Sequence, residues 1–526
     1  MKTISLIAFV LLTAVSAPAQ DDYFDLVRQA RAKNEAKEWS EAAKLWQRVV
    51  ALNPVRSSLW NALAEAHFEA KEYRQAIAAW EKALELGWWP AHTALHIGRA
   101  QARMGEHQKA VQSVRRSLDL RFPSLDQIQE HPDLKVLHDD AAFRDLVGLP
   151  PKESTTREEG WRRDLRLIRR EIERKGFQPY RRLSREQFDA RFAALEKNVP
   201  QLADIDVIVE IMRLLREVDD GHTGIIPPVE RPEFATALPL LFYLFREGVF
   251  IVAGDPSQRE LLGAEVLQIG KRPVAEAVAA LEPLVPRDNP HGVLERIPFL
   301  IRYPVLMKAL GFDATQLTLR LRDRSVREVK LAADATAPDI WRSLPANWVR
   351  LADTLGTPLP LYLKNRNLPY WFEYLPDEKL LFFQWNSVRS AREERFAAFV
   401  QRLMTFIAEN PVEKRVVDLR WNNGGNTVIG KTFVDALEKD AKVNARGKLF
   451  VIIGRRTYSA AQNVATMLEM ETNAILVGEQ SGSSPNFIGE EDFVKLPWSG
   501  ILMNVSDFYW QTSWPWDRRI WLAPEI

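Results

Sequence analysis

Two loops in the last third of the chain carry residues whose types suit acyl transfer. Residues 418–426 contain the pair Gly424 and Gly425, and residues 454–463 place Ser459 at the start of a predicted helix. Glycine lets backbone amides approach a ligand with no side chain in the way, and unpaired amides at a helix start favour developing negative charge. A serine hydroxyl beside such amides provides what acyl transfer requires, a nucleophile and an oxyanion hole.

Both patterns also have an ordinary structural interpretation. A pair of glycines after a strand, such as Gly424 and Gly425, is usually a turn. A serine at a helix start, such as Ser459, usually caps the helix. The local patterns alone leave these alternatives open.

The composition limits which other chemistries the chain can perform. It has 526 residues, 46% of them hydrophobic and 27% charged, which indicates a globular protein of several domains. The absence of cysteine excludes a thiol nucleophile, a disulfide framework and a thiolate zinc site. The sequence has no His–Glu metal helix and no phosphate loop of the Gly-Lys-Ser/Thr type, so we expect no cofactor and no metal. With 71 basic and 70 acidic residues, the net charge of +1 gives no reason to expect a nucleic-acid partner.

The segments around the two loops are predicted to form a parallel α/β core. Apolar strand-like runs alternate with helical patterns, which is typical of parallel strands joined by helices. We predict strands at 380–385, 415–420, 449–453 and 474–479, and helices at 396–407 and 460–470. In such folds sites form in the loops after strand ends, which is where both candidate loops lie.

The first residues predict a secretory signal peptide at 1–19. Lys2 precedes an apolar run at 4–15, and Ala17-Pro18-Ala19 forms a small-x-small cleavage signal, so that the mature chain would start near Gln20. The run is too short to span a bilayer, and no later stretch qualifies. We therefore expect a periplasmic or extracellular protein with no membrane span.

From residue 39 the chain repeats itself with a period of 34 residues. Equivalent positions are Trp46, Trp80 and Val114; Ala42, Ala76 and Ala110; and Leu52, Leu86 and Leu120. This period predicts pairs of antiparallel helices stacked as a solenoid. The runs at 60–64 and 73–76 resemble the tetratricopeptide family, which implies an all-α solenoid over residues 20–150. Such repeats would dock a protein partner, or act as a spacer for the next domain.

Residues 151–345 are predicted to form two intermediate parts. The helical spacing of apolar residues indicates a helical subdomain at 151–230. Residues 231–345 change to strand-like patterns, and the run 263–277 is similar to the centre of a PDZ-type module. That similarity implies an α+β fold that binds peptides by adding a strand to a sheet edge. A plain small β-domain is the alternative.

The order of motifs along residues 155–526 resembles the tail-specific, or C-terminal-processing, serine protease family and its tricorn-core relatives. The matching runs are Asp-Gly-His-Thr at 220–223, the PDZ-like run, Asp-Leu-Arg-x-Asn-x-Gly at 418–424, Tyr-Ser-Ala-Ala at 458–461 and Val-Gly-Glu at 477–479. The resemblance implies a multidomain chain that ends in a crotonase-like α/β catalytic domain at 346–526.

The same resemblance assigns roles to the two candidate loops. It implies that Ser459 is the nucleophile. It also implies that the backbone amides of Ala460 and of Gly424 or Gly425 form the oxyanion hole.

The resemblance also indicates which side chain activates the nucleophile. One branch of the family uses a lysine from the loop after the Val-Gly-Glu strand, but residues 480–486 contain none. The tricorn-like branch uses a histidine, which His222 in Asp-Gly-His-Thr matches, and an ordinary histidine pKa of about 6.5 suits a general base. We therefore expect a His-dependent serine-type peptidase rather than a Ser–Lys dyad. The alternative is that His222 only ends a helix or forms a turn.

A general base needs a carboxylate that orients it. Asp517 stands where the tricorn-like branch keeps an acidic residue, and Asp219 and Asp220 next to the histidine are alternatives. The neighbours Arg518 and Arg519 also allow Asp517 to be a surface ion-pair residue.

Together these features predict a secreted serine endopeptidase that cleaves unfolded or C-terminal segments of polypeptides. The alternative is a catalytically inactive peptide-binding scaffold on a protease-like fold, with repeats that dock a partner. Relatives continue beyond a Pro-acidic-aliphatic run such as residues 524–526, so the resemblance also implies a further strand and helix after this point.

Overall fold

The computed structural model describes residues 19–150, 155–226, 231, 234–335, 344–356, 358–490 and 492–526, with side chains from residue 23 onward. Residues 1–18 of the predicted signal peptide lie outside this set. The chain divides into two compact units, Met1–Pro150 and Pro151–Ile526. Within the described residues, no helix combines the length and the hydropathy needed to cross a membrane.

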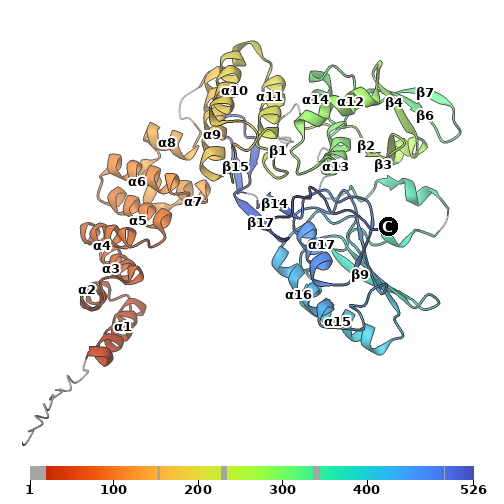
Figure 1. The fold of residues 1–526 in the computed structure, drawn as a ribbon. Helices are drawn as coiled ribbons and strands as arrows, with labels where there is room; N and C mark the ends of the chain where they lie inside the picture. The colour runs from red at the N-terminus through yellow and green to blue at the C-terminus, as the bar shows by residue number, and fades with distance from the viewer. Residues whose placement is uncertain are drawn as a thin grey trace, which may run out of the picture. The chain divides into compact units, whose positions relative to one another are not determined.

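The described part of the first unit is helical (Figure 1). Its α-helices are α1 (Ala19–Glu35), α2 (Trp39–Leu52), α3 (Ser57–Glu69), α4 (Tyr73–Glu85), α5 (Pro90–Arg103), α6 (His107–Asp119), α7 (Leu125–Glu130) and α8 (Ala141–Val147). The helices α2, α4 and α6 begin 34 residues apart, and consecutive helices from α1 to α6 pack on one another. The predicted repeat is therefore confirmed.

The repeated positions of the first unit differ in burial. The tryptophan, valine and alanine positions form its core: Trp46, Trp80, Val114, Ala42, Ala76 and Ala110. Alanines at these positions allow the backbones of neighbouring helices to approach each other closely. The repeated leucines Leu52, Leu86 and Leu120 are exposed instead, because each lies at or just after a helix end.

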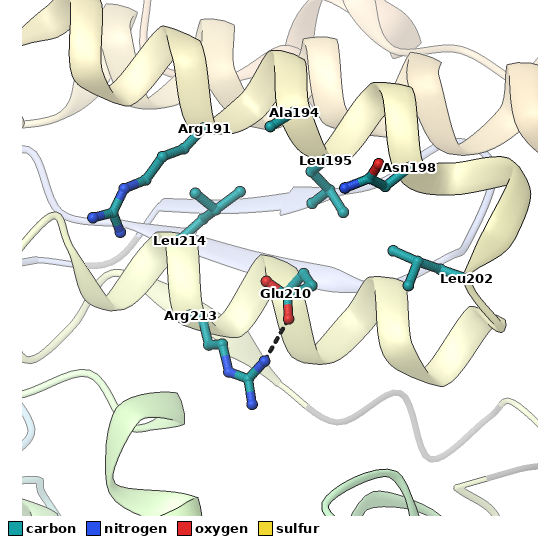
Figure 2. Close-up of a pocket in the computed structure, with 8 residues that line it drawn as sticks. All are labelled: Arg191, Ala194, Leu195, Asn198, Leu202, Glu210, Arg213 and Leu214. Atoms are coloured by element: carbon teal, nitrogen blue, oxygen red, sulfur yellow. Dashed lines mark hydrogen bonds and ion pairs between the residues drawn. The ribbon is translucent and has the colours of Figure 1, made fainter.

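The second unit begins with α9 (Arg157–Lys175), α10 (Arg185–Asn198) and α11 (Asp204–Arg216). The side chains of Thr156 and Ser184 cap α9 and α10 by accepting hydrogen bonds from amides of the first turn. A hollow of about 470 Å³ lies between α10 and α11 (Figure 2). It is lined by Arg191, Ala194, Leu195, Asn198, Leu202, Glu210, Arg213 and Leu214. None of the predicted site residues is among them.

An antiparallel sheet follows in the order β2-β3-β4-β6-β7, with β5 paired to β4 and β8 paired to β3. Its strands are β2 (Leu240–Leu244), β3 (Val249–Gly254), β4 (Glu265–Ile269), β5 (Arg272–Pro273), β6 (Gln316–Arg320), β7 (Val326–Lys330) and β8 (Val349–Arg350). The helices between these strands are α12 (Val274–Leu281), α13 (Pro290–Leu300) and α14 (Pro304–Ala309). Of these, α13 packs against β2.

The sheet that carries the two candidate loops has the order β13-β12-β11-β10-β9. Its elements are β9 (Tyr370–Leu375), β10 (Leu380–Trp385), α15 (Phe396–Glu409), β11 (Lys414–Asp418), α16 (Thr427–Glu438), β12 (Leu449–Ile453), α17 (Ala460–Glu471) and β13 (Ile475–Gly478). Strands β10 to β13 are parallel, so the predicted parallel core is confirmed, and β9 adds an antiparallel edge. The three helices pack against this sheet (Figure 1) around a core that includes Phe383, Trp385, Phe399 and Phe433.

Two small sheets lie in the last part of the second unit, and one of them includes a strand from the middle of the chain. β1 (Gly224–Ile226) pairs with β16 (Leu502–Val505), which also pairs with β15 (Asp492–Lys495). β14 (Asn486–Gly489) pairs with β17 (Phe508–Gln511). The pairing of β1 with β16 holds the loop that carries His222 against residues far along the sequence.

Candidate active site

Ser459 lies in the turn between β12 and α17, and its hydroxyl has no hydrogen-bond partner among the described residues. Its φ and ψ are 54° and −127°, a conformation that is strained for a residue with a side chain. Although it occupies the N-cap position, its side chain accepts no hydrogen bond from the first turn of the helix. The capping interpretation of this serine is therefore wrong, and its hydroxyl is free for chemistry.

The glycine loop packs directly against this serine. Gly424 is buried with a φ of 116°, and a Cβ at this position would lie 2.7 Å from Ser459 Cβ and 3.1 Å from Ala460 N. The amide of Tyr458 donates to the carbonyl of Asn422 at 3.2 Å and ties the two loops together. Only glycine at 424 leaves the space beside the serine and the first helical amide open.

The three predicted oxyanion amides are not equivalent. Gly424 N–H donates to Asn422 Oδ1 at 3.0 Å and is already satisfied, which removes it from the predicted set. Val388 pairs with Gly425 in a parallel bridge and donates its N–H to the Gly424 carbonyl at 2.9 Å. Because such a bridge uses the groups flanking Gly425, the N–H of Gly425 points away from Val388. The amides of Gly425 and Ala460 have no partner in the part of the chain that the structure describes.

His222 lies in the loop between α11 and β1 and is only 5% exposed. Its ring stacks on Tyr458 and on Phe487, with centroids 4.6 and 5.6 Å away. Nδ1 is 2.9 Å from Tyr458 Oη, whereas Nε2 is buried and has no hydrogen-bond partner of normal geometry among the described residues. Burial, helped by the charge of Arg296 and opposed by the Ile488 carbonyl, lowers the pKa of His222 to about 3. The imidazole is therefore neutral at physiological pH.

Tyr458, rather than Ser459, occupies Nδ1 of the histidine. The Ile488 carbonyl faces the imidazole and favours the tautomer with its proton on Nε2, so that Nδ1 accepts the hydrogen bond from the phenol. Burial and the nearby Asp288 raise the pKa of Tyr458 well above its usual value, so the phenol stays protonated. The Arg296 guanidinium lies 4.8 Å from the centre of the tyrosine ring. The predicted hydrogen bond between His222 and Ser459 is absent from the described contacts of this conformation.

Two buried carboxyl groups support the histidine loop. Asp220 Oδ1 accepts the backbone N–H of His222 at 2.9 Å, so it holds the loop rather than the imidazole. Asp288 Oδ1 accepts Gly221 N–H at 2.8 Å, and its other oxygen accepts the Ser483 hydroxyl. Burial raises the pKa of Asp288 to about 6, and the charge of Asp220 adds to this shift.

Gly221 is the point where the tyrosine and this carboxyl group meet. A Cβ at Gly221 would lie 2.3 Å from Tyr458 Oη and 2.9 Å from the Asp288 carboxyl group. Gly221 therefore lets the phenol, the carboxyl group and the histidine loop pack together. Asp219, the other alternative, is partly exposed and pairs with Arg182 and Arg216.

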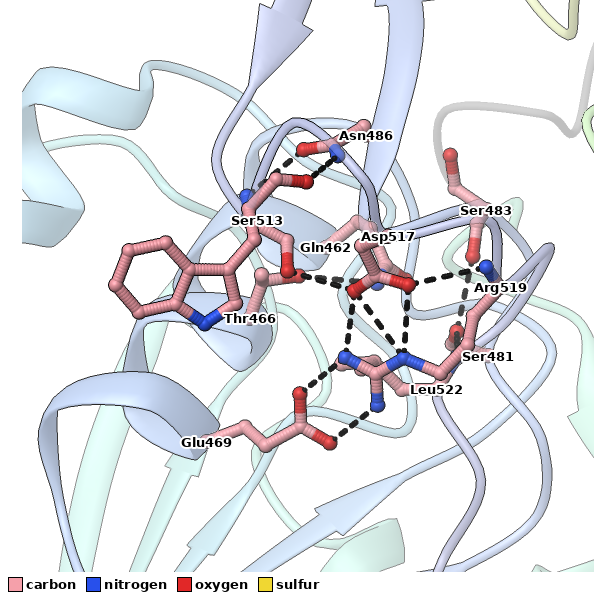
Figure 3. Close-up of polar contacts among 11 residues, drawn as sticks. Gln462, Thr466, Glu469, Ser481, Ser483, Asn486, Ser513, Asp517, Arg519 and Leu522 are labelled. Atoms are coloured by element: carbon pink, nitrogen blue, oxygen red, sulfur yellow. Dashed lines mark hydrogen bonds and ion pairs between the residues drawn. The ribbon is translucent and has the colours of Figure 1, made fainter.

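Asp517 lies in a different set of contacts (Figure 3). It accepts the Ser513 hydroxyl at 2.6 Å and pairs with Arg519 at 2.8 Å, and Arg519 also pairs with Glu469 at 2.7 Å. These hydrogen bonds, that of Arg519 first, hold the pKa of Asp517 well below its usual range. Within the described part of the chain, none of these contacts joins the carboxylate to His222. Asp517 thus forms an ion pair with Arg519, which was the alternative interpretation, and it does not orient His222 in this structure.

One acidic group among the described residues has the spacing of a metal site. Asp435, Glu438 and Glu471 bring one oxygen each within 4.8 Å of the others. Lys431 already pairs with Glu471 at 2.8 Å and with Asp435. The lysine ammonium supplies the positive charge that this group needs, and no candidate site residue belongs to it.

The arrangement contains two of the groups that acyl transfer needs, a free hydroxyl and unpaired amides, but the described residues place no base in contact with that hydroxyl. It has a strained, unpaired serine hydroxyl and two unpaired amides on the loops that meet there. The candidate base, His222, forms its hydrogen bond with the phenol of Tyr458, the residue before Ser459. Sequence reasoning missed Tyr458, Arg296 and Asp288; only Tyr458, next to Ser459 in the chain, offered a local signal.

No protein-family model matches the sequence, and no curated protein does. Solved structures that resemble the chain include mature CPAF complexed with lactacystin, at 12% identity over 66% of this chain and 90% of that chain, with a TM-score of 0.46. Another is the photosystem II D1 C-terminal processing protease, at 14% identity over 71% and 93% of the two chains, with a TM-score of 0.34.

A third resembling structure has a much shorter match. The Yersinia enterocolitica type III secretion chaperone SycD, in complex with a peptide of the translocator YopD, matches 22% of this chain and 87% of its own at 15% identity, with a TM-score of 0.20. At these scores the chemistry of the site rests on its own geometry. The structures that this chain resembles include a C-terminal processing protease.

Proposed function

We propose that this chain is a serine-type peptidase in which Ser459 is the nucleophile. The observation that carries the proposal is the junction of the two loops. The strained Ser459 packs against Gly424, with the unpaired amides of Gly425 and Ala460 on either side. Ser459 Oγ would bond to the substrate carbonyl carbon, and the two amides would donate to the resulting oxyanion. Water would then hydrolyse the acyl-enzyme.

His222 is the proposed general base. Its Nδ1 would accept the Ser459 proton once the Tyr458 phenol turns away, and would return that proton to the leaving amine. The support is that His222 stacks on the residue bonded to the nucleophile. Asp288, which contacts the loop at Gly221, is a better candidate than Asp517 for the carboxyl group that positions this base.

The proposed organisation follows the tail-specific proteases. Residues 346–526 would form a crotonase-like catalytic domain, and the antiparallel sheet within 231–345 a PDZ-like module that captures unfolded or C-terminal polypeptide segments. Residues 151–230 would be a helical subdomain, and 20–150 a repeat domain that docks a protein partner. Removal of a signal peptide at 1–19 would place the protein in the periplasm or outside the cell.

The test is covalent labelling of the full chain with a fluorophosphonate, followed by cleavage of an unfolded protein read by mass spectrometry. Labelling of Ser459, and discrete cuts that vanish in Ser459→Ala, would establish the peptidase. Labelling that persists in Ser459→Ala would show that another residue reacts. The absence of both labelling and cuts would contradict the proposal.

A catalytically inactive peptide-binding scaffold is the second candidate. The observation that favours it is that two of the predicted catalytic residues form other contacts. His222 Nδ1 is hydrogen-bonded to Tyr458, and Asp517 forms an ion pair with Arg519. A scaffold would bind unfolded polypeptides equally well before and after Ser459→Ala and would cleave none of them.

A further inference from the structure

Helix α13 is held at both of its ends by buried polar side chains. Asn289, which caps its start, donates through Nδ2 to the carbonyl oxygens of Ser481 and Ile520 at 3.0 and 2.7 Å. Arg302, just beyond its end, donates through Nε to the carbonyl oxygen of Leu240 in β2 at 2.7 Å. The side chains that α13 presents between these two anchors therefore have fixed positions.

Two adjacent side chains of α13 contact the turn that carries Ser459. Glu295 forms an ion pair with Arg456 at 3.1 Å, three residues before the serine. The Arg296 guanidinium lies 4.8 Å from the centre of the ring of Tyr458, the residue directly before the serine. The helix thus holds the nucleophile turn at two places.

Arg296 also contacts the loop that carries the candidate base. Its Nη1 donates to the carbonyl oxygen of Gly221 at 2.8 Å and to that of Pro286 at 3.2 Å. Gly221 directly precedes His222. A guanidinium can serve several partners at once because its five N–H donors form a rigid fork. One side chain therefore joins the histidine loop to Tyr458.

The phenol of Tyr458 lies between Arg296 and His222 in one chain of polar contacts. Its oxygen is 2.9 Å from Nδ1, and a phenol that donates to this nitrogen can still accept a second hydrogen bond. Burial and then Asp288 raise the pKa of Tyr458, whereas the charge of Arg296 and its hydrogen bond with the phenol oppose this rise. The cation therefore acts on the phenol itself, and a hydrogen bond accepted by the oxygen strengthens the one that the O–H donates.

We propose that Arg296 is a positioning residue that holds the Tyr458 phenol on Nδ1 of His222 and so withholds this nitrogen from Ser459; this rests on the proposed function. A cation over the face of the ring resists its rotation. The hydrogen bond to Gly221 keeps that cation beside the histidine loop. The phenol has to leave both partners before Nδ1 can accept the serine proton, so Arg296 acts through the phenol and takes no part in the chemistry.

The test is a double-mutant cycle on the full chain, with the rate of fluorophosphonate labelling of Ser459 as its readout. Arg296→Gln removes the charge and the fork, and we expect labelling several-fold faster than in the parent. When Arg296→Gln is combined with Tyr458→Phe, the rate should equal that of Tyr458→Phe alone, because no phenol is left for the arginine to hold. Arg296→Lys, which keeps a charged donor, should react more slowly than Arg296→Gln.

Arg402→Gln is the matched control. Arg402 also lies over a ring, 5.0 Å from the centre of Phe372, and it pairs with Glu394 at 2.8 Å. Its loss should leave the labelling rate unchanged. Melting temperatures check that each variant folds, and Arg296→Lys takes the place of Arg296→Gln in the cycle if the latter does not fold.

A second readout does not depend on the serine. Diethyl pyrocarbonate modifies a histidine nitrogen that has a free lone pair, and mass spectrometry of the peptide that contains His222 follows this reaction. Arg296→Gln and Tyr458→Phe should each accelerate the modification several-fold, and the double variant should be no faster than Tyr458→Phe.

Rates in Arg296→Gln equal to those of the parent would overturn the proposal. So would a change of the same size with and without Tyr458→Phe, because the arginine would then act independently of the phenol. The proposed function fails separately. A chain whose His222 shows the non-additive gain, but whose Ser459 takes no label in any variant, would keep the role of Arg296 and lose the peptidase.

Discussion

Tyr458 Oη lies 2.9 Å from His222 Nδ1, and the residue that carries this phenol is joined by a peptide bond to Ser459. The lone pair that a general base would offer to the serine is therefore already occupied. Burial keeps the imidazole neutral and the phenol protonated, so the hydrogen bond persists over the physiological pH range. The candidate nucleophile and base are neighbours of one tyrosine but are not yet in contact with each other.

Tyr458→Phe tests whether the phenol restrains the base. Phenylalanine keeps the ring that stacks on His222 at 4.6 Å and removes only the hydroxyl. We expect fluorophosphonate labelling of Ser459 to become several-fold faster, because Nδ1 is freed. The gain should be lost when His222→Ala is added. A tenfold slower reaction in a folded Tyr458→Phe chain would instead make the phenol part of the chemistry.

Gly424→Ala should abolish the reaction of Ser459. The added Cβ would lie 2.7 Å from Ser459 Cβ and 3.1 Å from the Ala460 amide, which blocks the space that an oxyanion needs. We expect a loss of at least about 100-fold in labelling rate. Gly447→Ala is the matched control, because Gly447 also has a positive φ, 79°, but no atom lies within 4 Å of the position that its Cβ would take. Gly447→Ala should lose about 1 kcal/mol of stability from its backbone conformation alone, and Gly424→Ala should lose more because its Cβ also clashes. Equal labelling in two folded variants would contradict the prediction.

Asp288→Asn should stabilise the chain above pH 6. The pKa of Asp288 is raised by burial from 3.8 to about 6, so the folded carboxyl group keeps its proton in a pH range where the unfolded one has lost it. Stability therefore falls as the pH rises from 3.8 to 6, by up to about 3 kcal/mol. Chemical denaturation at pH 7.5 should show a gain of about 1–3 kcal/mol for Asp288→Asn, which disappears below pH 4. If Asp288→Asn were less stable than the parent at pH 7.5, the fold would favour the ionised carboxylate of Asp288, which would contradict the prediction. Asp219→Asn, at a partly exposed position, is the control.

The pH dependence of labelling reports the state of His222. Its pKa is lowered from 6.5 to about 3 by burial, so the base is unprotonated at every pH well above 3. The labelling rate should then show no acid limb between pH 7.5 and 5. Between pH 6.5 and 3 the unfolded histidine takes up a proton that the folded one does not, so stability should fall as the pH falls through this range. An inflection between pH 6 and 7 in the labelling rate would mean that the reacting histidine is solvated.

Asp517→Asn should leave the labelling rate within about threefold of the parent. Its carboxylate is bound by Ser513 and Arg519 and touches neither Ser459 nor His222 in the described contacts. The loss should be one of stability, about 1 kcal/mol, because an ion pair continued to Glu469 is weakened. Arg519→Gln, which breaks the same pair, should have a similar effect. A hundredfold slower labelling in Asp517→Asn, but not in Arg519→Gln, would show that Asp517 orients the general base after all.

The repeat and the order of the parallel strands could be predicted from the sequence because both are set by neighbours along the chain. A 34-residue period determines where α2, α4 and α6 begin. Alternating apolar strands and amphipathic helices determine the connection from β10 to β13. The position of Ser459 between a strand and a helix is local in the same sense, and so is the glycine pair after β11.

The partners of these residues were decided only by the tertiary structure. Gly424 and Gly425 are adjacent glycines in the same loop. The amide of Gly424 donates to the Asn422 side chain, whereas the amide of Gly425 has no partner among the described residues. Asp517 had the right residue type for an orienting carboxylate, but it pairs with the arginine two residues away. Asp288 had no motif around it, and it reaches the histidine loop because α13 packs near that loop.

The sequence by itself thus determined the elements and the loop on which the nucleophile stands, because backbone conformation follows from the pattern of neighbouring residues. It did not determine that Tyr458 binds His222, or that Arg296 joins Tyr458 to the histidine loop. These contacts join residues far apart in the chain. They depend on how the sheets and helices pack and on which charges that packing removes from water.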